Sequence, residues 1–357
     1  MSAPAASSGS TTSAHRFPWK WWLRDLASVP KNGMNVFSCF ACGGGSSMGY
    51  KLAGFTVLGN CEIDPAVAET YKVNNHPKHS FIMDVREFLQ LPDEKIPDEL
   101  FHLDILDGSP PCSVFSEVGE REKGWSKAKR FAEGQKLQRL DDLFFTFIAI
   151  AKRLQPKVVV AENVIGLVKG NARGYVNEIC KAFDEAGYEI QIFRLNAASM
   201  GVPQKRERVF FIARRKNLGL PKVKLDFHEP PILFRDVRSE HGIPIDPASK
   251  TAERLRLRIP SDKGVDDIIR RTVGGTSNFS LKIVHDNDVC WTQTTTRILR
   301  DCDASYLTDD DVRNCASFPQ DYVFATKEPL FFCGMSVPPV MMANIAYEIA
   351  HQIFGVK

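Results

Sequence analysis

Short apolar runs alternate with amphipathic stretches between residues 34 and 213, and this alternation limits the possible folds more than any other feature of the chain. Short apolar runs between turn residues predict buried strands, and apolar residues with a period near 3.6 predict helices. The expected strands are 34–40, 56–61, 80–83, 103–106, 157–161, 190–195 and 209–213, and the expected helices are 46–53, 65–75, 141–154 and 174–186. Strand–helix alternation of this kind predicts an α/β fold with a doubly wound, mostly parallel sheet.

The remaining segments differ in character from this alternating region. Residues 1–30 begin with a Ser/Ala/Thr-rich stretch and are interpreted as a tail without fixed structure, although 17–26 hold three tryptophans and could form a small helix packed on the body. The uncharged, Ser-rich start also resembles a transit peptide. We expect residues 31–213 and 330–357 to form the large domain, closed by an amphipathic helix over 340–354. Residues 214–329 would then hold a smaller domain and a hinge.

Charge and cysteine content say little about function by themselves. The net charge is +3 and the chain has nine cysteines, but no apolar run is long enough for a secretory signal or a membrane span. We therefore expect no membrane association and mostly free thiols in a reducing compartment. Residues 214–300 carry 17 Lys and Arg against 11 Asp and Glu, which fits either a polyanion-binding face or an ordinary solvated surface. Within this region, the alternation over 254–258 predicts a strand.

A glycine-rich turn follows the first expected strand. Residues 40–45 read Phe-Ala-Cys-Gly-Gly-Gly, and Glu62 and Asp84 stand at the ends of the next two strands. Glycines let the backbone approach a ligand, and an acid at the second strand end can bind ribose hydroxyls. The pattern predicts a nucleotide-like cofactor but is not a Walker loop. Cys39 and Cys42 form a C-x-x-C pair, which leaves a redox role open, whereas two further ligands for zinc are missing.

A candidate nucleophile follows the fourth expected strand. Cys112 comes directly after Pro110 and Pro111, whose fixed φ angles stiffen the backbone before the thiol. The carboxyl edge of a parallel sheet is where such folds bind ligands. A thiolate there could attack an electrophilic carbon, although a single cysteine is more often a buried structural residue.

Six segments in order resemble the landmarks of the DNA cytosine-C5 methyltransferase family. They are Phe40–Gly45, the Pro-Pro-Cys at 110–112, Glu-Asn-Val at 162–164, Gln-Lys-Arg-Glu-Arg at 204–208, Leu307-Thr308 with Ser317-Phe318-Pro319, and Gly-Met-Ser-Val-Pro-Pro at 334–339. The resemblance covers about residues 34–357 apart from a variable region. It implies an S-adenosylmethionine-dependent methyltransferase sheet with a smaller target-recognition domain at 216–300, whose short length suggests a simple target site.

The family's chemistry implies roles for four residues. Cys112 would add to C6 of cytosine, so that C5 becomes nucleophilic enough to take a methyl group. Glu162 would hold N3 protonated, which burial of the carboxyl favours, and Arg208 would stabilise negative charge at O2. Arg206 is grouped with these catalytic residues, with support of the DNA backbone or of the loop as its expected role. The target base must leave the DNA stack to reach such a thiol.

The resemblance also implies a set of cofactor contacts. S-adenosylmethionine would lie against the glycine-rich turn, with Glu62 on its ribose and Asp84 on its adenine. No metal is implied. The remaining residues expected around the cofactor are Phe40, Cys42, Gly44, Gly45, Pro110, Leu143, Ser336 and Val337. Residues 113–130 resemble the loop that closes over the flipped base.

Several positions depart from the family pattern. The family usually has Gly where Cys42 stands, commonly Asp where Ser38 stands, and usually Asn where Met335 stands. Its Arg-Leu-Gln after the Leu-Thr segment is Asn-Cys-Ala at 314–316. These departures concern the cofactor and hinge elements and leave Cys112, Glu162 and Arg208 intact.

The implied partner is double-stranded DNA, bound by a monomer, with a cognate restriction endonuclease as a further candidate partner. The setting would be cytoplasmic and nucleoid-associated in a bacterium or phage, or nuclear in a eukaryote. A tRNA-directed cytosine-C5 methyltransferase is one alternative, although that branch usually has Cys-Phe-Thr where residues 112–114 read Cys-Ser-Val. A catalytically silent DNA-binding homologue is the other, and comparison of a Cys112→Ala variant with the wild type would separate it from an enzyme.

Overall fold

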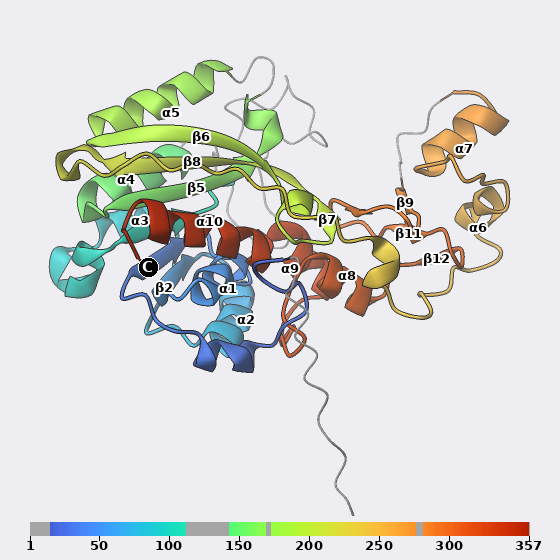
Figure 1. Cartoon of the computed structure of the whole chain (residues 1–357), viewed down its shortest axis with the longest axis horizontal. Helices are drawn as coiled ribbons and strands as arrows, with labels where there is room; N and C mark the ends of the chain where they lie inside the picture. Colours follow the sequence, from blue (N-terminus) through green and yellow to red (C-terminus); the bar gives the residue numbers. More distant parts are fainter. Residues whose placement is uncertain (1–14, 112–142, 169–172, 276–280, 357) are drawn as a thin grey trace, which may run out of the picture.

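The central element of the computed structural model is a seven-stranded sheet (Figure 1). The structure describes residues 15–111, 143–168, 173–275 and 281–356. The strands of the sheet lie in the order β3-β2-β1-β4-β5-β8-β6. Their bounds are β1 Asn35–Cys39, β2 Thr56–Glu62, β3 His79–Ile82, β4 Ile105–Gly108, β5 Val158–Val164, β6 Tyr188–Asn196 and β8 Glu207–Arg215. β1 to β5 pair in parallel, and β8 runs antiparallel to both β5 and β6. The predicted doubly wound, mostly parallel α/β sheet is confirmed.

Helices cover both faces of this sheet, because each central strand sends alternate apolar side chains to opposite sides. Val36, Ile105 and Val160 pack with α1 and α10 in one buried cluster. Phe37, Leu106 and Val159 pack with α3, α4 and α5 in a second one. The helices of this body are α1 Gly45–Leu52, α2 Pro65–Asn75, α3 Val85–Gln90, α4 Leu143–Leu154, α5 Arg173–Glu185, α8 Asp309–Cys315, α9 Pro329–Met335 and α10 Pro339–Gln352.

The strand order reverses between β1 and β4. To one side of this point the chain runs through β2 and β3, and to the other side it continues to β5. Connections on opposite faces diverge at such a switch point and leave a crevice at the carboxyl ends of the two strands. This crevice is therefore where a ligand site is expected.

A smaller unit extends from the body at the right of Figure 1. It contains α6 Lys250–Leu255, α7 Val265–Thr272 and the short strands β9 Ile283–Val284, β11 Leu299–Arg300 and β12 Ser305–Tyr306. Its own core includes Leu255, Ile268 and Leu299. Two other short strands, β7 Gln204–Lys205 and β10 Cys290–Trp291, pair with each other and connect this unit to the body. Not all of the region 214–329 contributes to this second core. Phe234 and Phe318, which lie in that region, belong to the core of the body.

Two expectations from the sequence are wrong. Residues 15–30 are not a free tail, and the alternative of a segment packed on the body is the one observed: Trp21 is 2% exposed and its ring N–H donates to the Ser317 carbonyl at 2.9 Å. Burial of this large ring fixes the segment, which continues as the 3₁₀ helix Leu23–Ser28. The predicted strand at 254–258 is instead the end of α6 and a turn, because Ser249 caps that helix and Leu255 alone of its residues is fully buried.

The C-terminal helices α9 and α10 form the one segment, within the described residues, that is long and apolar enough to cross a membrane. Its most apolar window is 83% buried inside the fold. Its apolar surface is therefore used by the core, where α10 packs against α1.

Candidate active site

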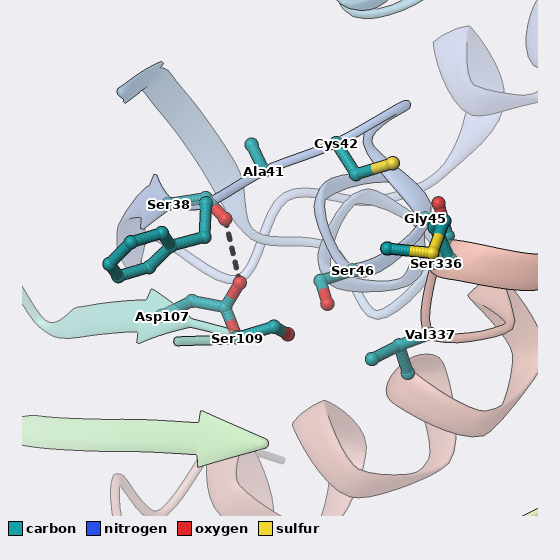
Figure 2. A pocket seen from close by; sticks show the side chains of 11 residues that line it. Ser38, Ala41, Cys42, Gly45, Ser46, Asp107, Ser109, Ser336 and Val337 are labelled. Carbon is teal, nitrogen blue, oxygen red and sulfur yellow. Dashed lines mark hydrogen bonds between the residues drawn. The ribbon is translucent and has the colours of Figure 1, made fainter. Parts of the chain in front are cut away.

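A pocket opens at the switch point, at the carboxyl ends of β1 and β4 (Figure 2). Its wall comes from three parts of the chain: the glycine-rich turn after β1, the end of β4, and the segment between α9 and α10. The lining residues are Ser38, Phe40, Ala41, Cys42, Gly45, Ser46, Asp107, Ser109, Met335, Ser336 and Val337. Of the ten residues expected around a cofactor, five line this pocket: Phe40, Cys42, Gly45, Ser336 and Val337.

The turn is held in an unusual backbone conformation. Phe40, Cys42 and Gly44 have positive φ values of 54°, 46° and 84°. Such angles cost free energy for residues with a Cβ and persist where surrounding contacts fix them. Glu62, the last residue of β2, supplies one such contact by accepting from the Cys42 backbone N–H at 3.0 Å. The acid at the second strand end thus orders the turn that forms the pocket.

Close packing explains the two glycines expected at the cofactor. A Cβ on Gly45 would lie 2.1 Å from the Val337 carbonyl oxygen, and a Cβ on Gly44 would lie 2.1 Å from Asn75 Nδ2. Gly45 therefore allows the segment before α10 to close one side of the pocket. Gly44 is absent from the lining, and its position is explained by its φ and by its contact with α2.

The C-x-x-C thiols at this turn are buried. Burial raises the pKa of Cys42 to about 11, with a further contribution from the negative charge of Glu62. Burial also raises the pKa of Cys39. Thiols in this state have little thiolate character, which disfavours a redox role for the pair.

Asp107 is a buried carboxylic acid in the pocket wall. It is 2% exposed, and its oxygens accept from Ser38 Oγ at 2.7 Å and from Tyr50 Oη at 3.3 Å. Burial is the main cause that raises the pKa of Asp107 to about 7, and the negative charge of Glu162 also contributes. The two hydrogen bonds act in the opposite direction and lower this pKa. Figure 2 shows its carboxylate pointing toward Ser38, with the side chains of Ser46 and Ser109 nearby.

A pair of oppositely charged residues lies along the same edge of the sheet, at the end of β5. Arg208 Nε lies 2.9 Å from Glu162 Oε1, and both side chains are mostly buried. The two meet because β8 runs antiparallel to β5, so that the start of β8 lies beside the end of β5. Burial lowers the pKa of Arg208, and the charge and hydrogen bond of Glu162 oppose that change. The structure thus brings these two predicted catalytic residues together.

The neighbouring Asn163 ties this edge to the loop that carries the candidate nucleophile. Its side-chain Nδ2 donates to the Pro110 carbonyl at 3.0 Å. Pro110 is buried at the end of β4 but does not line the pocket. Cys112, and with it the expected closing loop at 113–130, lies outside the described residues.

Arg206 lies apart from this pair. It is 1% exposed, and its guanidinium donates to the carbonyls of Gln293 at 3.0 Å and Gly334 at 2.9 Å. A buried side chain committed to two carbonyls faces neither a base nor a phosphate, so these contacts do not support a catalytic or DNA-supporting role, and support of the loop stays a prediction. Arg206 instead fastens the connection to the small unit onto the end of α9.

Two further predicted contacts lie outside the pocket. Asp84 caps α3, accepting from the Arg86 backbone N–H at 2.8 Å and pairing with the Arg86 side chain at 3.0 Å. It still stands at the carboxyl edge, after β3. Leu143 begins α4 and packs in the core between that helix and the sheet. No group of His, Cys, Asp and Glu side chains suited to a metal occurs in the described part of the chain.

Comparison with known proteins identifies the family. A family model described as C-5 cytosine-specific DNA methylase matches residues 34–351. The chain belongs to the C-5 cytosine-specific DNA methylase family.

Curated relatives of this chain include bacterial type II methyltransferases and an orphan methyltransferase of a Bacillus phage. The chain is 32% identical to M.NgoPII of Neisseria gonorrhoeae over 240 residues, which cover 64% of each protein. It is 27% identical to M1.HphI of Haemophilus parahaemolyticus over 340 residues, which cover 88% of the chain and 86% of that relative. The matches to M.NgoPII and to M.FnuDI of Fusobacterium nucleatum span 64% and 51% of those relatives, less than two thirds of their length.

Solved structures share the fold of this methylase. A prophage-encoded protein of E. coli, assigned as a DNA modification methyltransferase, superimposes with a TM-score of 0.64 at 22% identity, covering 90% of this chain and 99% of that one. The Dnmt2 methyltransferase of S. pombe superimposes with a TM-score of 0.56 at 16% identity, covering 91% and 99%.

The sequence pattern does not assign three polar residues of this pocket. Asp107 and Ser109 precede the Pro-Pro-Cys segment, and Ser46 begins an expected helix. The available signal was the polarity of Asp107 at the end of an otherwise apolar strand, which is costly unless the carboxyl has a partner.

Proposed function

We propose that the protein transfers a methyl group from S-adenosylmethionine to C5 of cytosine in double-stranded DNA. The observation that carries this proposal is the buried Glu162–Arg208 pair, which stands next to a pocket at the switch point and beside the base of the Pro-Pro-Cys loop. Family membership and the type II methyltransferases among the relatives support the same reaction.

Glu162 and Arg208 would bind the target base from one side. A carboxyl group can donate to N3 and accept from the 4-amino group of cytosine, and a guanidinium can donate to O2. Their 2.9 Å contact holds the two groups in a fixed relation before the base arrives. Preorganised donors of this kind stabilise charge as it develops on the ring, because they need no rearrangement during the reaction.

Cys112 would supply the covalent step. Its thiolate would add to C6, and the electron pair of the C5–C6 bond would form the bond from C5 to the methyl carbon. The bond from that carbon to the sulfonium sulfur would break at the same time and release S-adenosylhomocysteine. Loss of the C5 proton to a base then expels the thiolate and restores the double bond. The thiol therefore returns to its starting state. The order Pro110, Pro111, Cys112 after β4 supports this role from the sequence.

The pocket fits the amino-acid end of S-adenosylmethionine. The cofactor supplies an electrophilic methyl group on a sulfonium. Ser336 Oγ is buried, lines the pocket and has only the Cys42 thiol, a weak hydrogen-bonding group, as a partner among the described residues, so a polar ligand would satisfy it. Glu62 stands at the end of β2, where the ribose would lie. Phe40 and Val337 add apolar surface that excludes water.

Double-stranded DNA would lie between the body and the small unit. The surplus of positive charge in residues 214–300 suits phosphate contacts. Because Glu162 and Arg208 are mostly buried at the sheet edge, a base inside a duplex could not reach them. The target cytosine would therefore flip out of the stack.

The test is a methyl-transfer assay with radiolabelled S-adenosylmethionine, duplex DNA of mixed sequence and tRNA as separate acceptors. We expect label in duplex DNA only, with 5-methylcytosine at one short motif in bisulfite sequencing. The Cys112→Ala variant should bind the cofactor and transfer no label. Transfer to tRNA instead of DNA would contradict the proposal, and so would cofactor binding without transfer to either acceptor, the behaviour expected of a silent homologue.

A further inference from the structure

Asp107 has no part in the reaction proposed above, and among the described residues no cation pairs with it. It is 2% exposed, and its two hydrogen-bond donors, Ser38 and Tyr50, are both neutral. Across the described residues, none of the salt bridges involves Asp107, whereas the equally buried Asp104 at the start of the same strand pairs with Lys157 at 2.7 Å. A carboxylate buried without a cation is costly unless a partner arrives.

The other titratable groups that act on Asp107 come from every neighbouring element, and none of them is a cation. Glu162 of β5 raises its pKa. Cys39 of β1, Tyr50 of α1 and Tyr71 of α2 have pKa values that the charge of Asp107 itself raises. The described groups around Asp107 are therefore neutral or acidic, and a ligand in the pocket could supply the positive group.

The pocket side of Asp107 is built to receive such a group. Asp107 lines the pocket together with Ser46 and Ser109, and these side chains lie close together in Figure 2. Across the opening, Ser336 Oγ is buried and has only the weakly hydrogen-bonding Cys42 thiol as a partner in the described part of the chain. A ligand with hydrogen-bond donors toward Asp107 would satisfy the carboxylate, whereas a ligand with positive charge but no N–H group would leave its oxygens unbonded.

We propose that Asp107 binds the α-ammonium group of S-adenosylmethionine and thereby selects a cofactor with an intact amino-acid end. This inference rests on the proposed function, which supplies the identity of the ligand. Of the two positive groups of the cofactor, the sulfonium carries no N–H and must face the target base. The ammonium has three N–H donors and suits a carboxylate at the end of β4. Ser38 acts as a positioning residue, because its hydroxyl fixes one carboxylate oxygen.

The test compares two ligands by isothermal titration calorimetry. One is S-adenosylhomocysteine, which keeps the ammonium and lacks the sulfonium charge. The other is the adenosyl thioether of 4-mercaptobutyrate, the same molecule without its amino group. The proteins are the wild type and Asp107→Asn, which keeps the shape of the side chain and removes its charge. We expect the substitution to weaken S-adenosylhomocysteine by about 10- to 100-fold and to leave the amino-free ligand within about threefold.

The amino-free ligand is also the control for a damaged pocket. If Asp107→Asn weakens both ligands equally, or neither, the assignment of Asp107 is overturned while the proposed function stands. If the wild type binds neither ligand and also fails to bind S-adenosylmethionine, the proposed function fails and the assignment fails with it. Circular dichroism and thermal unfolding establish that the variant is folded before the affinities are compared.

Discussion

Ser38 and Asp107 are neighbours in two senses: they are register partners on β1 and β4, and the hydroxyl of one donates to the carboxylate of the other at 2.7 Å. The family pattern that the sequence resembles commonly has Asp where Ser38 stands, which is one of the departures noted above. In this structure a carboxylate stands directly across the ladder from Ser38. The acidic group at this end of the pocket thus lies on the adjacent strand, and Ser38 is the donor that orients it.

The affinity for S-adenosylhomocysteine should depend on the protonation of Asp107. The pKa of Asp107 is about 7 because burial disfavours the carboxylate, and only the carboxylate binds an ammonium group strongly. Lowering the pH from about 7.5 to about 5.5 protonates the free protein and should weaken binding by roughly tenfold per pH unit below this pKa. Calorimetry across this range measures the slope. A slope that persists unchanged in Asp107→Asn would mean that another group titrates.

Breaking the Glu162–Arg208 pair from one side should cost more stability than removing both partners. Arg208→Met leaves a mostly buried carboxylate without its 2.9 Å partner, and we expect a loss of roughly 3 kcal/mol in the free energy of unfolding. Glu162→Gln together with Arg208→Met should recover part of this loss. Urea unfolding of the single and double variants measures the coupling. Strictly additive effects would show that the contact is not energetically significant.

The same pair should be required for turnover. Glu162→Gln keeps the size of the side chain but removes its carboxyl, and we expect methyl transfer to fall by roughly 10² to 10⁴-fold with little change in cofactor affinity. Single-turnover assays with saturating S-adenosylmethionine separate the chemical step from binding. An unchanged rate in this variant would remove Glu162 from the mechanism.

Arg206 should matter for stability more than for chemistry. Arg206→Met removes the donors to the carbonyls of Gln293 and Gly334, and we expect unfolding to become easier by about 2–4 kcal/mol. Arg194→Met is the matched control, because Arg194 is 57% exposed and forms only a surface pair with Glu207. Its loss should stay within about 0.5 kcal/mol. Equal losses in the two variants would contradict the structural role of Arg206.

Gly45 should tolerate no side chain. Gly45→Ala would place a Cβ 2.1 Å from the Val337 carbonyl oxygen, so the segment before α10 must move and the pocket must open. We expect a clear loss of both thermal stability and cofactor affinity. Gly174→Ala in α5 is the control, because its Cβ would meet nothing within 4 Å and the change should stabilise the helix by about 0.4–1 kcal/mol. Similar affinities in the two variants would show that close packing at Gly45 is not needed for the pocket.

Much of the large domain could be predicted from local sequence pattern. The strands of a buried parallel sheet are continuous apolar runs, so β2 was placed to within one residue and β5 to within three, and the helical period placed α2 with its observed bounds. The small unit could not be predicted in the same way. Its strands have two residues each and hold their places through the core around Ile268 and Leu299, contacts that no local pattern contains.

In the candidate site, too, the residues within recognisable sequence segments were predicted, and those that depend on distant contacts were not. Phe40, Cys42, Ser336 and Val337 were found because they stand in recognisable segments, and they do line one pocket. Arg206 was grouped with Arg208 because both arginines stand in the same Gln-Lys-Arg-Glu-Arg segment. Only the fold shows that the first guanidinium is bound by two carbonyls and the second by Glu162. Asp107 was missed because its partners come from β1 and α1, far away in the sequence.

The pocket joins residues near the start of the fold to residues near its end. Ser38 to Ser46 form one wall and Met335 to Val337 the opposite one, and α1 packs on α10 through Gly49, whose Cβ would lie 2.5 Å from the Pro339 carbonyl oxygen. The pocket therefore cannot form until the chain has been translated as far as α10. Under the proposed function, a chain that terminates before this helix would lack the cofactor pocket and would transfer no methyl group.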